Sequence, residues 1–225
     1  MNNGIFRARV PWLVLSLALA GTGPLPASTF IETADAGLLT STANLTTISS
    51  GSPLDVILGT LSEDDADIFA IVLNGGTLFT ATTASNVTSF FDTTLFLFNS
   101  AGLGLVANDD CPFNPPQSSI EFMPPTTGTY YLALAGFGFF PRSAAGLIWP
   151  LDGGLLPPGL LGPAGPGGAQ ALNGWLGSSP EAGAYRITLT GAQALAVPEP
   201  GTSLLVGAGL LWAVRKQVRR TSHES

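Results

Sequence analysis

The sequence predicts an all-β sandwich, and three observations support this prediction. Between residues 51 and 136, short apolar runs alternate with clusters of Gly, Asn, Asp, Pro and Ser, at the spacing typical of sandwich strands. No long stretch repeats apolar residues at the 3.6-residue period of a helix. At 225 residues, the chain is long enough to bury one core of ordinary size. The expected strands are 55–61, 67–73, 77–84, 93–99, 104–107, 119–122, 129–135 and 185–190.

Two of these segments allow sharper predictions. Residues 94–98 read Thr-Leu-Phe-Leu-Phe and have no polar face, so they fit a strand that is buried on both sides. Asn74-Gly75-Gly76 predicts a hairpin turn, because glycine tolerates a positive φ.

Residues 137–183 form a long insertion before the last expected strand. Residues 155–168 contain five glycines and four prolines, which cannot propagate a helix or a β-ladder, so we expect a loop without regular structure. The insertion also contains Trp149 and Trp175. Aromatic rings on a sandwich rim can stack on sugar rings, or they can pin a loop to the sheet as a satellite core. The sequence leaves both roles open.

Charge is distributed unevenly, and this excludes several functions. Residues 28–200 include fourteen acidic residues and two arginines, a net charge of −12, so the body repels nucleic-acid backbones. The only histidine is His223 and the only lysine is Lys216, both near the C-terminus. The body therefore lacks the groups for Ser-His-Asp, Cys-His and Ser-Lys sites, for Schiff bases and for His-ligated zinc. Carboxylate-only hydrolysis stays open, although the glutamates are scattered along the chain. The single Cys111 excludes an internal disulfide.

Both ends of the chain predict targeting segments. Residues 1–27 fit a secretory signal peptide, with Arg7 and Arg9 before the apolar run 10–20 and the small Ala27 before the expected cut. The apolar run is too short to span a bilayer comfortably, because spanning takes about 20 residues.

The C-terminal end has three parts in a fixed order. Pro198-Glu199-Pro200 is followed by the short apolar helix expected at 202–214, and then by the basic cluster Arg215, Lys216, Arg219 and Arg220. The basic cluster is expected to stay cytoplasmic, which places the body outside the membrane. This arrangement resembles the PEP-CTERM sorting signal of Gram-negative bacteria. The resemblance implies an exosortase-type processing enzyme as partner, removal of the tail, and a destination at the cell surface or in the exopolysaccharide matrix. A plain membrane anchor is the alternative.

Four motifs in the body resemble those of the bacterial pre-peptidase C-terminal domain. They occur in the family's order: Asp65-Ala66-Asp67-Ile68-Phe69, Asp92-Thr93-Thr94-Leu95-Phe96-Leu97-Phe98, Asn108-Asp109-Asp110 and Gly128-Thr129-Tyr130-Tyr131-Leu132. The resemblance implies a jelly-roll-like β-sandwich without catalytic activity. It departs after Gly136, where the family domain normally ends soon and this chain continues.

The acidic residues at strand ends predict a calcium site. Asp65, Asp67, Asp92, Asp109 and Asp110 stand where side-chain and backbone oxygens can converge, and calcium takes six to eight oxygen ligands. The alternative is that these residues only cap turns, as aspartate often does.

Together these patterns predict a signal peptide at 1–27, a lead-in at 28–50, a sandwich at 51–194 with the insertion 137–183, and a sorting tail at 195–225. We expect a non-catalytic exported surface or matrix protein that is anchored briefly by its tail, with calcium as its candidate ligand. The alternatives are a secreted carbohydrate-binding module and, third, a carboxylate-dependent hydrolase.

Overall fold

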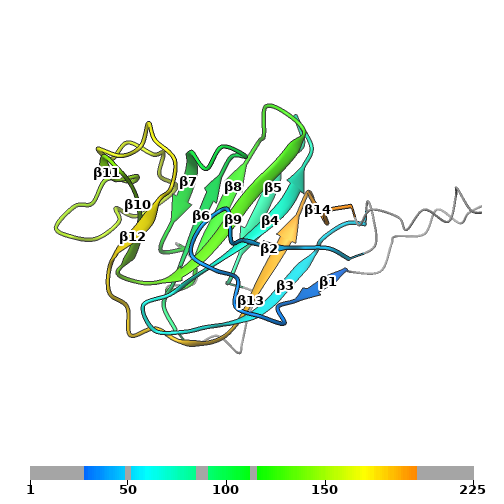
Figure 1. The fold of residues 1–225 in the computed structure, drawn as a ribbon, viewed down its shortest axis with the longest axis horizontal. Coiled ribbons are helices and arrows are strands. Elements are labelled where there is room, and N and C mark those ends of the chain that lie inside the picture. The colour runs from blue at the N-terminus through cyan, green and yellow to red at the C-terminus, as the bar shows by residue number, and fades with distance from the viewer. Residues whose placement is uncertain (1–27, 49–51, 85–90, 112–115, 197–225) are drawn as a thin grey trace, which may run out of the picture.

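The computed structural model describes residues 28–48, 52–84, 91–111 and 116–196, and these residues contain fourteen strands and no helix. Most strands lie in two sheets that face each other, with a small third sheet beside them (Figure 1). The prediction of an all-β, sandwich-like fold is therefore confirmed. The predicted signal peptide 1–27, the apolar segment 202–214, the Pro198–Pro200 motif and the basic cluster lie outside the described residues.

Strand pairing defines the three sheets. The five-stranded sheet has the order β1 (Thr29–Ile31), β3 (Val56–Leu61), β13 (Gly183–Thr190), β5 (Phe79–Thr82) and β8 (Ser119–Phe122). The six-stranded sheet has the order β14 (Ala192–Gln193), β4 (Ala66–Leu73), β9 (Gly128–Gly136), β6 (Thr93–Phe98) and β7 (Gly104–Asn108), with β2 (Asn44–Leu45) also paired to β4. The small sheet has the order β11 (Gly146–Leu147), β10 (Phe139–Ser143) and β12 (Gly174–Gly177).

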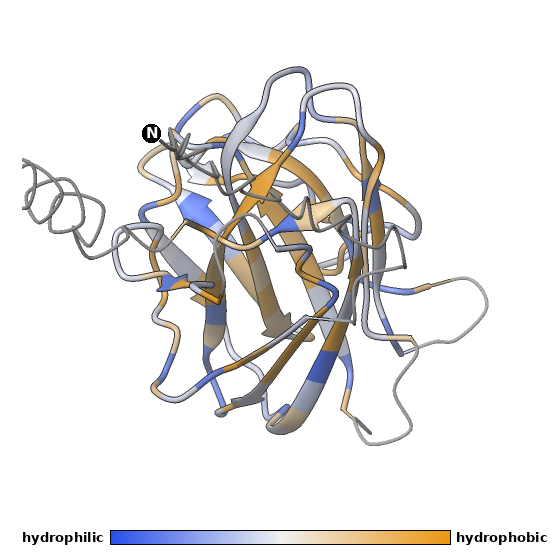
Figure 2. Ribbon diagram, turned by 90° about the vertical axis from the view of Figure 1, so that its right-hand side faces the viewer, coloured by the Kyte–Doolittle hydropathy of each residue, from blue (hydrophilic) through white to orange (hydrophobic). Residues whose placement is uncertain are grey.

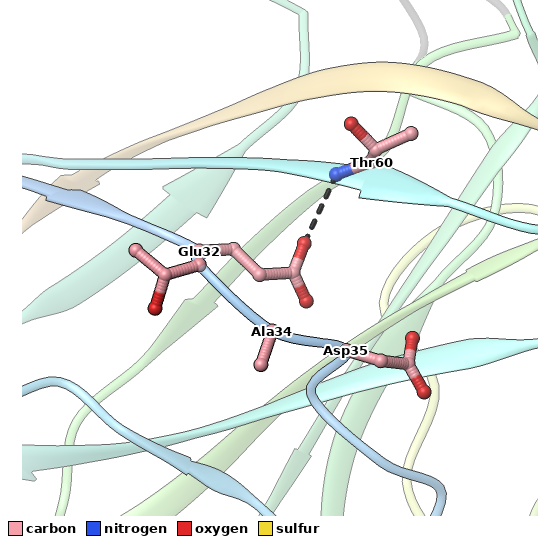
Figure 3. Close-up of a pocket in the computed structure, with 5 residues that line it drawn as sticks. Glu32, Ala34, Asp35 and Thr60 are labelled. Atoms are coloured by element: carbon pink, nitrogen blue, oxygen red, sulfur yellow. Dashed lines mark hydrogen bonds between the residues drawn. The ribbon is translucent and has the colours of Figure 1, made fainter.

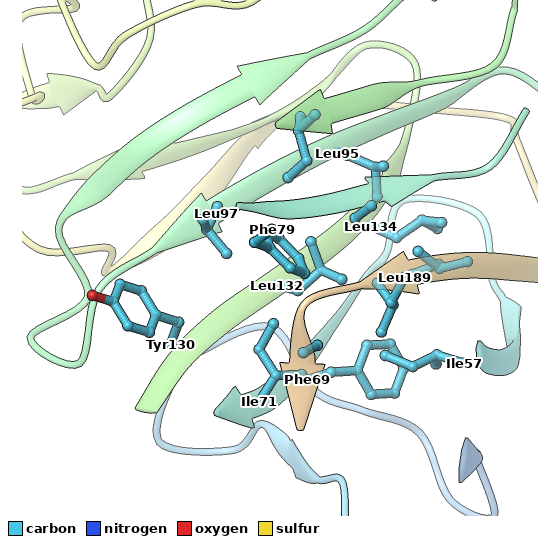
Figure 4. Packing of buried hydrophobic residues seen from close by; sticks show 14 of the residues in the cluster. Ile57, Phe69, Ile71, Phe79, Leu95, Leu97, Tyr130, Leu132, Leu134 and Leu189 are labelled. Atoms are coloured by element: carbon cyan, nitrogen blue, oxygen red, sulfur yellow. The ribbon is translucent and has the colours of Figure 1, made fainter. Parts of the chain in front are cut away.

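The main core lies between the two large sheets (Figure 4). Alternate residues of a strand point to opposite faces of its sheet, and β4 and β6 follow this rule. Phe69 and Ile71 of β4 and Leu95 and Leu97 of β6 belong to this core and are fully buried. The hydropathy colouring shows the same division, with apolar residues along the strands and polar residues at many of the turns (Figure 2).

A second core covers the outer face of the six-stranded sheet. Phe96 and Phe98 of β6 point into it and meet Ile148 and Trp149 of the insertion. All six residues of β6 are buried, which confirms the prediction that this strand is covered on both sides. The insertion is thus a third layer of the fold.

The Gly/Pro-rich stretch 155–168 belongs to no named strand, as expected, but the rest of the insertion is more regular than a long loop. Strands β10, β11 and β12 lie within it, and close backbone contacts order the Gly/Pro-rich stretch between them. A Cβ atom at Gly167 would collide with the carbonyl oxygen of Gly146, and one at Gly168 with that of Pro163. Glycine is therefore required here because two backbones approach closely, which composition alone does not reveal.

Each of the eight expected strands is present, with ends within two residues of the prediction. The lead-in contributes strands that were not expected: β1 pairs in parallel with β3, and β2 in parallel with β4. It therefore contacts both large sheets. Asn74-Gly75-Gly76 does form a turn, with Thr77 N–H donating to Asn74 O at 3.1 Å and Gly76 at φ 74°. It is not a hairpin, because β4 and β5 belong to different sheets.

No helix within the described part of the chain has the length and apolar character needed to cross a membrane.

Candidate metal centre

Three carboxylates converge where the lead-in crosses the start of β4. Strand β1 runs alongside β3 and places Glu32 next to Thr60, whose N–H donates to Glu32 Oε2 at 3.0 Å (Figure 3). The chain then turns through Asp35, and Asp67 is the second residue of β4. One carboxylate oxygen from each of Glu32, Asp35 and Asp67 lies within 4.8 Å of the other two. A shallow pocket of about 240 Å³, lined by Glu32, Thr33, Ala34, Asp35 and Thr60, opens beside them.

Asp67 is the unusual member of this cluster. Its side chain has no solvent exposure, and neither carboxylate oxygen has a hydrogen-bond partner among the described residues. The pKa of Asp67 is raised to about 7, mainly by burial, with the charges of Glu32, Asp65 and Asp35 adding to the shift and the nearby Tyr185 hydroxyl opposing it. An unpaired buried carboxylate costs several kcal/mol in its charged form. The fold therefore holds Asp67 in a position where a bound proton or cation stabilises its carboxyl group.

Glu32 shows the same pattern to a lesser degree. Burial raises its pKa, with Asp35 adding to the shift and the hydrogen bond from Thr60 opposing it. Its second oxygen, Oε1, is buried without a partner, while the Tyr185 hydroxyl donates to Oε2 at 3.4 Å. Burial, together with Asp67 and Glu32, raises the pKa of the Tyr185 hydroxyl well above its ordinary value, so this group stays protonated and can donate to these carboxylates.

The cluster has the donor chemistry of a hard cation site. It offers carboxylate oxygens and no nitrogen or sulfur, and its members differ in exposure: Asp67 is buried, Glu32 is half-buried and Asp35 is exposed. Calcium accepts such mixed oxygen sets and completes its coordination with backbone oxygens and water. The open side of the pocket leaves room for those waters.

Of the five aspartates predicted as ligands, only Asp67 belongs to this cluster. Asp65 is its neighbour: Oδ1 accepts the N–H of Ala66 at 2.8 Å, and burial and the proximity of Asp35 raise its pKa. Glu32 and Asp35 were not among the predicted ligands. They are three residues apart in the lead-in, but nothing in the local pattern indicates that this segment lies against residue 67.

Asp92, Asp109 and Asp110 lie near the ends of β6 and β7 and serve a different purpose in the structure. The backbone N–H of Asp92 donates to Glu181 Oε2 at 3.0 Å, and its carbonyl oxygen accepts the N–H of Phe137 at 3.1 Å. Asp92 thus joins both ends of the insertion. Its Oδ1 is buried without a partner, and burial, with Asp109, Asp110 and Glu181, raises its pKa to about 7.

Asp109 is buried and accepts a hydrogen bond from the Thr94 hydroxyl at 2.6 Å. Burial raises its pKa, and the Thr94 bond opposes the shift. The preceding Asn108 donates to Gly159 O and accepts the N–H of Ser119, which ties β7 to the insertion and to β8. The contacts of Asn108 and Asp109 fit the alternative of turn and loop stabilisation, whereas the calcium prediction for Asp92, Asp109 and Asp110 stays a prediction.

The two tryptophans act as packing residues. Trp149 is 2 % exposed, its indole N–H donates to Leu161 O at 3.1 Å, and its ring contacts Phe96 and Phe98. Its faces are therefore not available to a sugar, which corrects the stacking hypothesis for this residue. Trp175 is half-buried, stacks on Phe139 with centroids 5.4 Å apart, and donates to Leu38 O at 2.7 Å. The satellite-core alternative fits both rings.

Comparison with known proteins agrees with this β domain. Residues 65–136 match the model of the bacterial pre-peptidase C-terminal domain, which is a non-catalytic domain found in secreted proteases. Among solved structures, the chain is similar to the pre-peptidase C-terminal domain of a collagenase from Bacillus anthracis, with 11 % identity and a TM-score of 0.34, over 75 % of this chain and 100 % of that one. No curated protein sequence matches the chain.

Proposed function

We propose, from the premise that residues 65–136 form a pre-peptidase C-terminal domain, that this chain is an exported, non-catalytic surface or matrix protein whose body binds calcium through Glu32, Asp35 and Asp67. The observation that carries the calcium proposal is the Asp67 carboxylate, which is fully buried and has no hydrogen-bond partner among the described residues. A divalent cation supplies the missing partner for both of its oxygens.

Calcium binding has a structural consequence in this geometry. Glu32 and Asp35 belong to the lead-in, whereas Asp67 belongs to β4, so a shared ion joins the lead-in to the six-stranded sheet. A ligand that binds only the folded state stabilises it, by about 2.7 kcal/mol at a concentration one hundred times its Kd. The ion is therefore proposed to act as a cross-link in the body rather than as a catalyst.

The calcium proposal is tested by calorimetry and thermal unfolding of the purified protein after chelation. We expect heat on titration with calcium and a higher Tm in its presence, because the ion relieves repulsion among three carboxylates. Asp67→Asn should abolish both effects. Asp152→Asn, an exposed acid in the insertion, is the matched control and should leave them unchanged. Absence of heat together with an unchanged Tm in the unmodified protein would show that the cluster is not a calcium site.

Sorting through the tail is the second part of the proposal. The order of Pro198-Glu199-Pro200, an apolar stretch and a basic cluster supports processing by an exosortase-type enzyme after transient anchoring in the inner membrane of a Gram-negative bacterium. Delivery would then be to the surface or to exopolysaccharide.

Fractionation of cells producing the chain with and without Pro198-Glu199-Pro200 tests this step. We expect the unmodified protein to be released from the membrane with a mass that lacks the basic cluster, and the variant to stay membrane-bound with that cluster intact. Arg142→Gln in the body is the control and should not affect release. Equal release of both forms, with the tail still present, would contradict exosortase-type processing.

The structure does not favour the other two candidate functions. A carbohydrate-binding face needs exposed aromatic rings, and Trp149 is buried. Glycoside hydrolysis needs two carboxyl groups that reach the sugar from about 5 to 9 Å apart. In the converging cluster the Asp67 side chain is shielded from solvent, so a sugar cannot reach it. This arrangement suits an ion better than a substrate.

A further inference from the structure

Ser28 is held at the beginning of β3 by three hydrogen bonds. Its backbone N–H donates to Asp55 Oδ2 at 2.7 Å. Its carbonyl oxygen accepts the N–H of Asp55 at 2.9 Å and that of Val56 at 3.2 Å. None of these bonds involves a residue before Ser28. Among the described residues, the contact that positions its nitrogen is made by Asp55 of the body.

Asp55 is itself fixed in place. Its carbonyl oxygen accepts the N–H of Leu189 at 2.8 Å, which connects it to β13, and its side chain is half-buried. It lies where β3 begins, whereas the Glu32, Asp35 and Asp67 cluster lies where β3 ends and β4 begins. A positive charge at Ser28 would therefore interact with the Asp55 carboxylate rather than with the acids of that cluster.

We propose that the leader is removed between Ala27 and Ser28, and that the α-ammonium group created at Ser28 forms an ion pair with Asp55 that the uncut chain cannot form. This inference rests on the proposed export of the chain. Maturation then does more than remove a targeting segment, because it also adds a charged contact to the edge of the five-stranded sheet.

The chemistry of the cut accounts for the new charge. A signal peptidase adds one water across the Ala27–Ser28 peptide bond, the C–N bond breaks, and Ala27 leaves with a carboxylate. The amine on Ser28 takes up a proton, since an α-amino group has a pKa of about 7.7–8.0 in the absence of partners. The single N–H donor of the amide is replaced by a cation with three donors, already within hydrogen-bonding distance of Asp55 Oδ2. Because the uncut amide already donates to this carboxylate, the cut adds the attraction between two opposite charges at hydrogen-bond distance.

The experiment exploits the scarcity of lysine. Lys216 is the only lysine in the chain, so in a Lys216→Arg background an amine-selective acetylating reagent modifies only the N-terminus. The exported protein is purified, its N-terminal residue is determined by mass spectrometry, and its unfolding is compared before and after acetylation. We expect an N-terminal Ser28 and a fall of about threefold in the folded-to-unfolded equilibrium constant on acetylation.

Two further variants separate the ion pair from other effects of acetylation. Asp55→Asn should remove the difference between the free and acetylated forms, whereas Asp152→Asn should preserve it. An exported protein that begins at another residue, or one whose acetylation has the same effect with and without Asp55→Asn, overturns the ion pair and leaves the proposed export intact. A chain that stays uncut inside the cell overturns both.

Discussion

Replacing Phe96 with alanine should lower the free energy of unfolding by about 3–5 kcal/mol. Phe96 is fully buried, and its ring centroid lies 5.1 Å from that of Trp149 and 5.7 Å from that of Trp175. It is therefore the residue through which the six-stranded sheet contacts both tryptophans of the insertion. Removing the ring leaves a cavity between two layers that strand pairing holds in place, so the site cannot collapse to fill it.

Chemical denaturation of the two proteins measures this effect, with Leu155→Ala as the control. Leu155 is 48 % exposed and lies in the same insertion, so its truncation should change stability by no more than about 0.5 kcal/mol. The tryptophan fluorescence of Phe96→Ala should also shift before global unfolding, because Trp149 and Trp175 lose a shared neighbour. A loss below about 1 kcal/mol for Phe96→Ala would mean that the insertion does not pack on the sheet as described.

The calcium-free protein should become less stable as the pH rises from about 4 to about 7. The folded-state pKa of Asp67 is about 7, whereas an unfolded aspartate titrates near 3.9. The folded state therefore binds more protons than the unfolded state in this window, and raising the pH removes the stabilisation that those protons provide. Because Asp67 is fully buried, the effect amounts to roughly 2–4 kcal/mol between pH 4 and pH 8.

Asp67→Asn should remove this part of the pH dependence and make the calcium-free protein more stable than the unmodified one at pH 8. Saturating calcium should reverse the order, because only the unmodified protein binds the ion. Asp92→Asn is the informative comparison, because Asp92 also has a pKa of about 7 but lies outside the carboxylate cluster. The Asp92→Asn protein should therefore still be stabilised by calcium. Thermal unfolding at pH 5 and pH 8, with chelator or calcium, distinguishes these cases. A calcium-free Tm that rises from pH 5 to pH 8 would contradict the assignment.

The sandwich strands could be predicted because each one carries its own pattern. The Thr-Leu-Phe-Leu-Phe run of β6 indicates burial on both faces without reference to the rest of the chain. The strands of the insertion carry no such pattern. Strand β12 begins and ends with glycine, and β10 contains Pro141, so their extended conformation comes from pairing with each other and from packing on Phe96 and Phe98.

The candidate site could be predicted only in part, for a related reason. The Asp-x-Asp pattern at Asp65 and Asp67 identifies carboxylates at the start of a strand, and Asp67 belongs to the cluster. Its partners Glu32 and Asp35 come from a segment about thirty residues earlier, placed by the parallel pairing of β1 with β3. Two-residue and three-residue strands have too few positions to show a period, so their pairing cannot be inferred from the sequence.

Both ends of the described chain leave the sandwich on the same side. Ser28 is bonded to Asp55 where β3 begins, and Gln193 pairs with Val72 near the end of β4 and bridges to Pro53 (Figure 1). The three converging carboxylates lie toward the other end of β3, and Glu32 is four residues beyond Ser28, roughly 13 Å along the strand at about 3.3 Å per residue. If the protein were attached at either terminus, the same end of the sandwich, opposite Ser28 and Gln193, would therefore face away from the attachment point. That end carries the carboxylates of Glu32, Asp35 and Asp67.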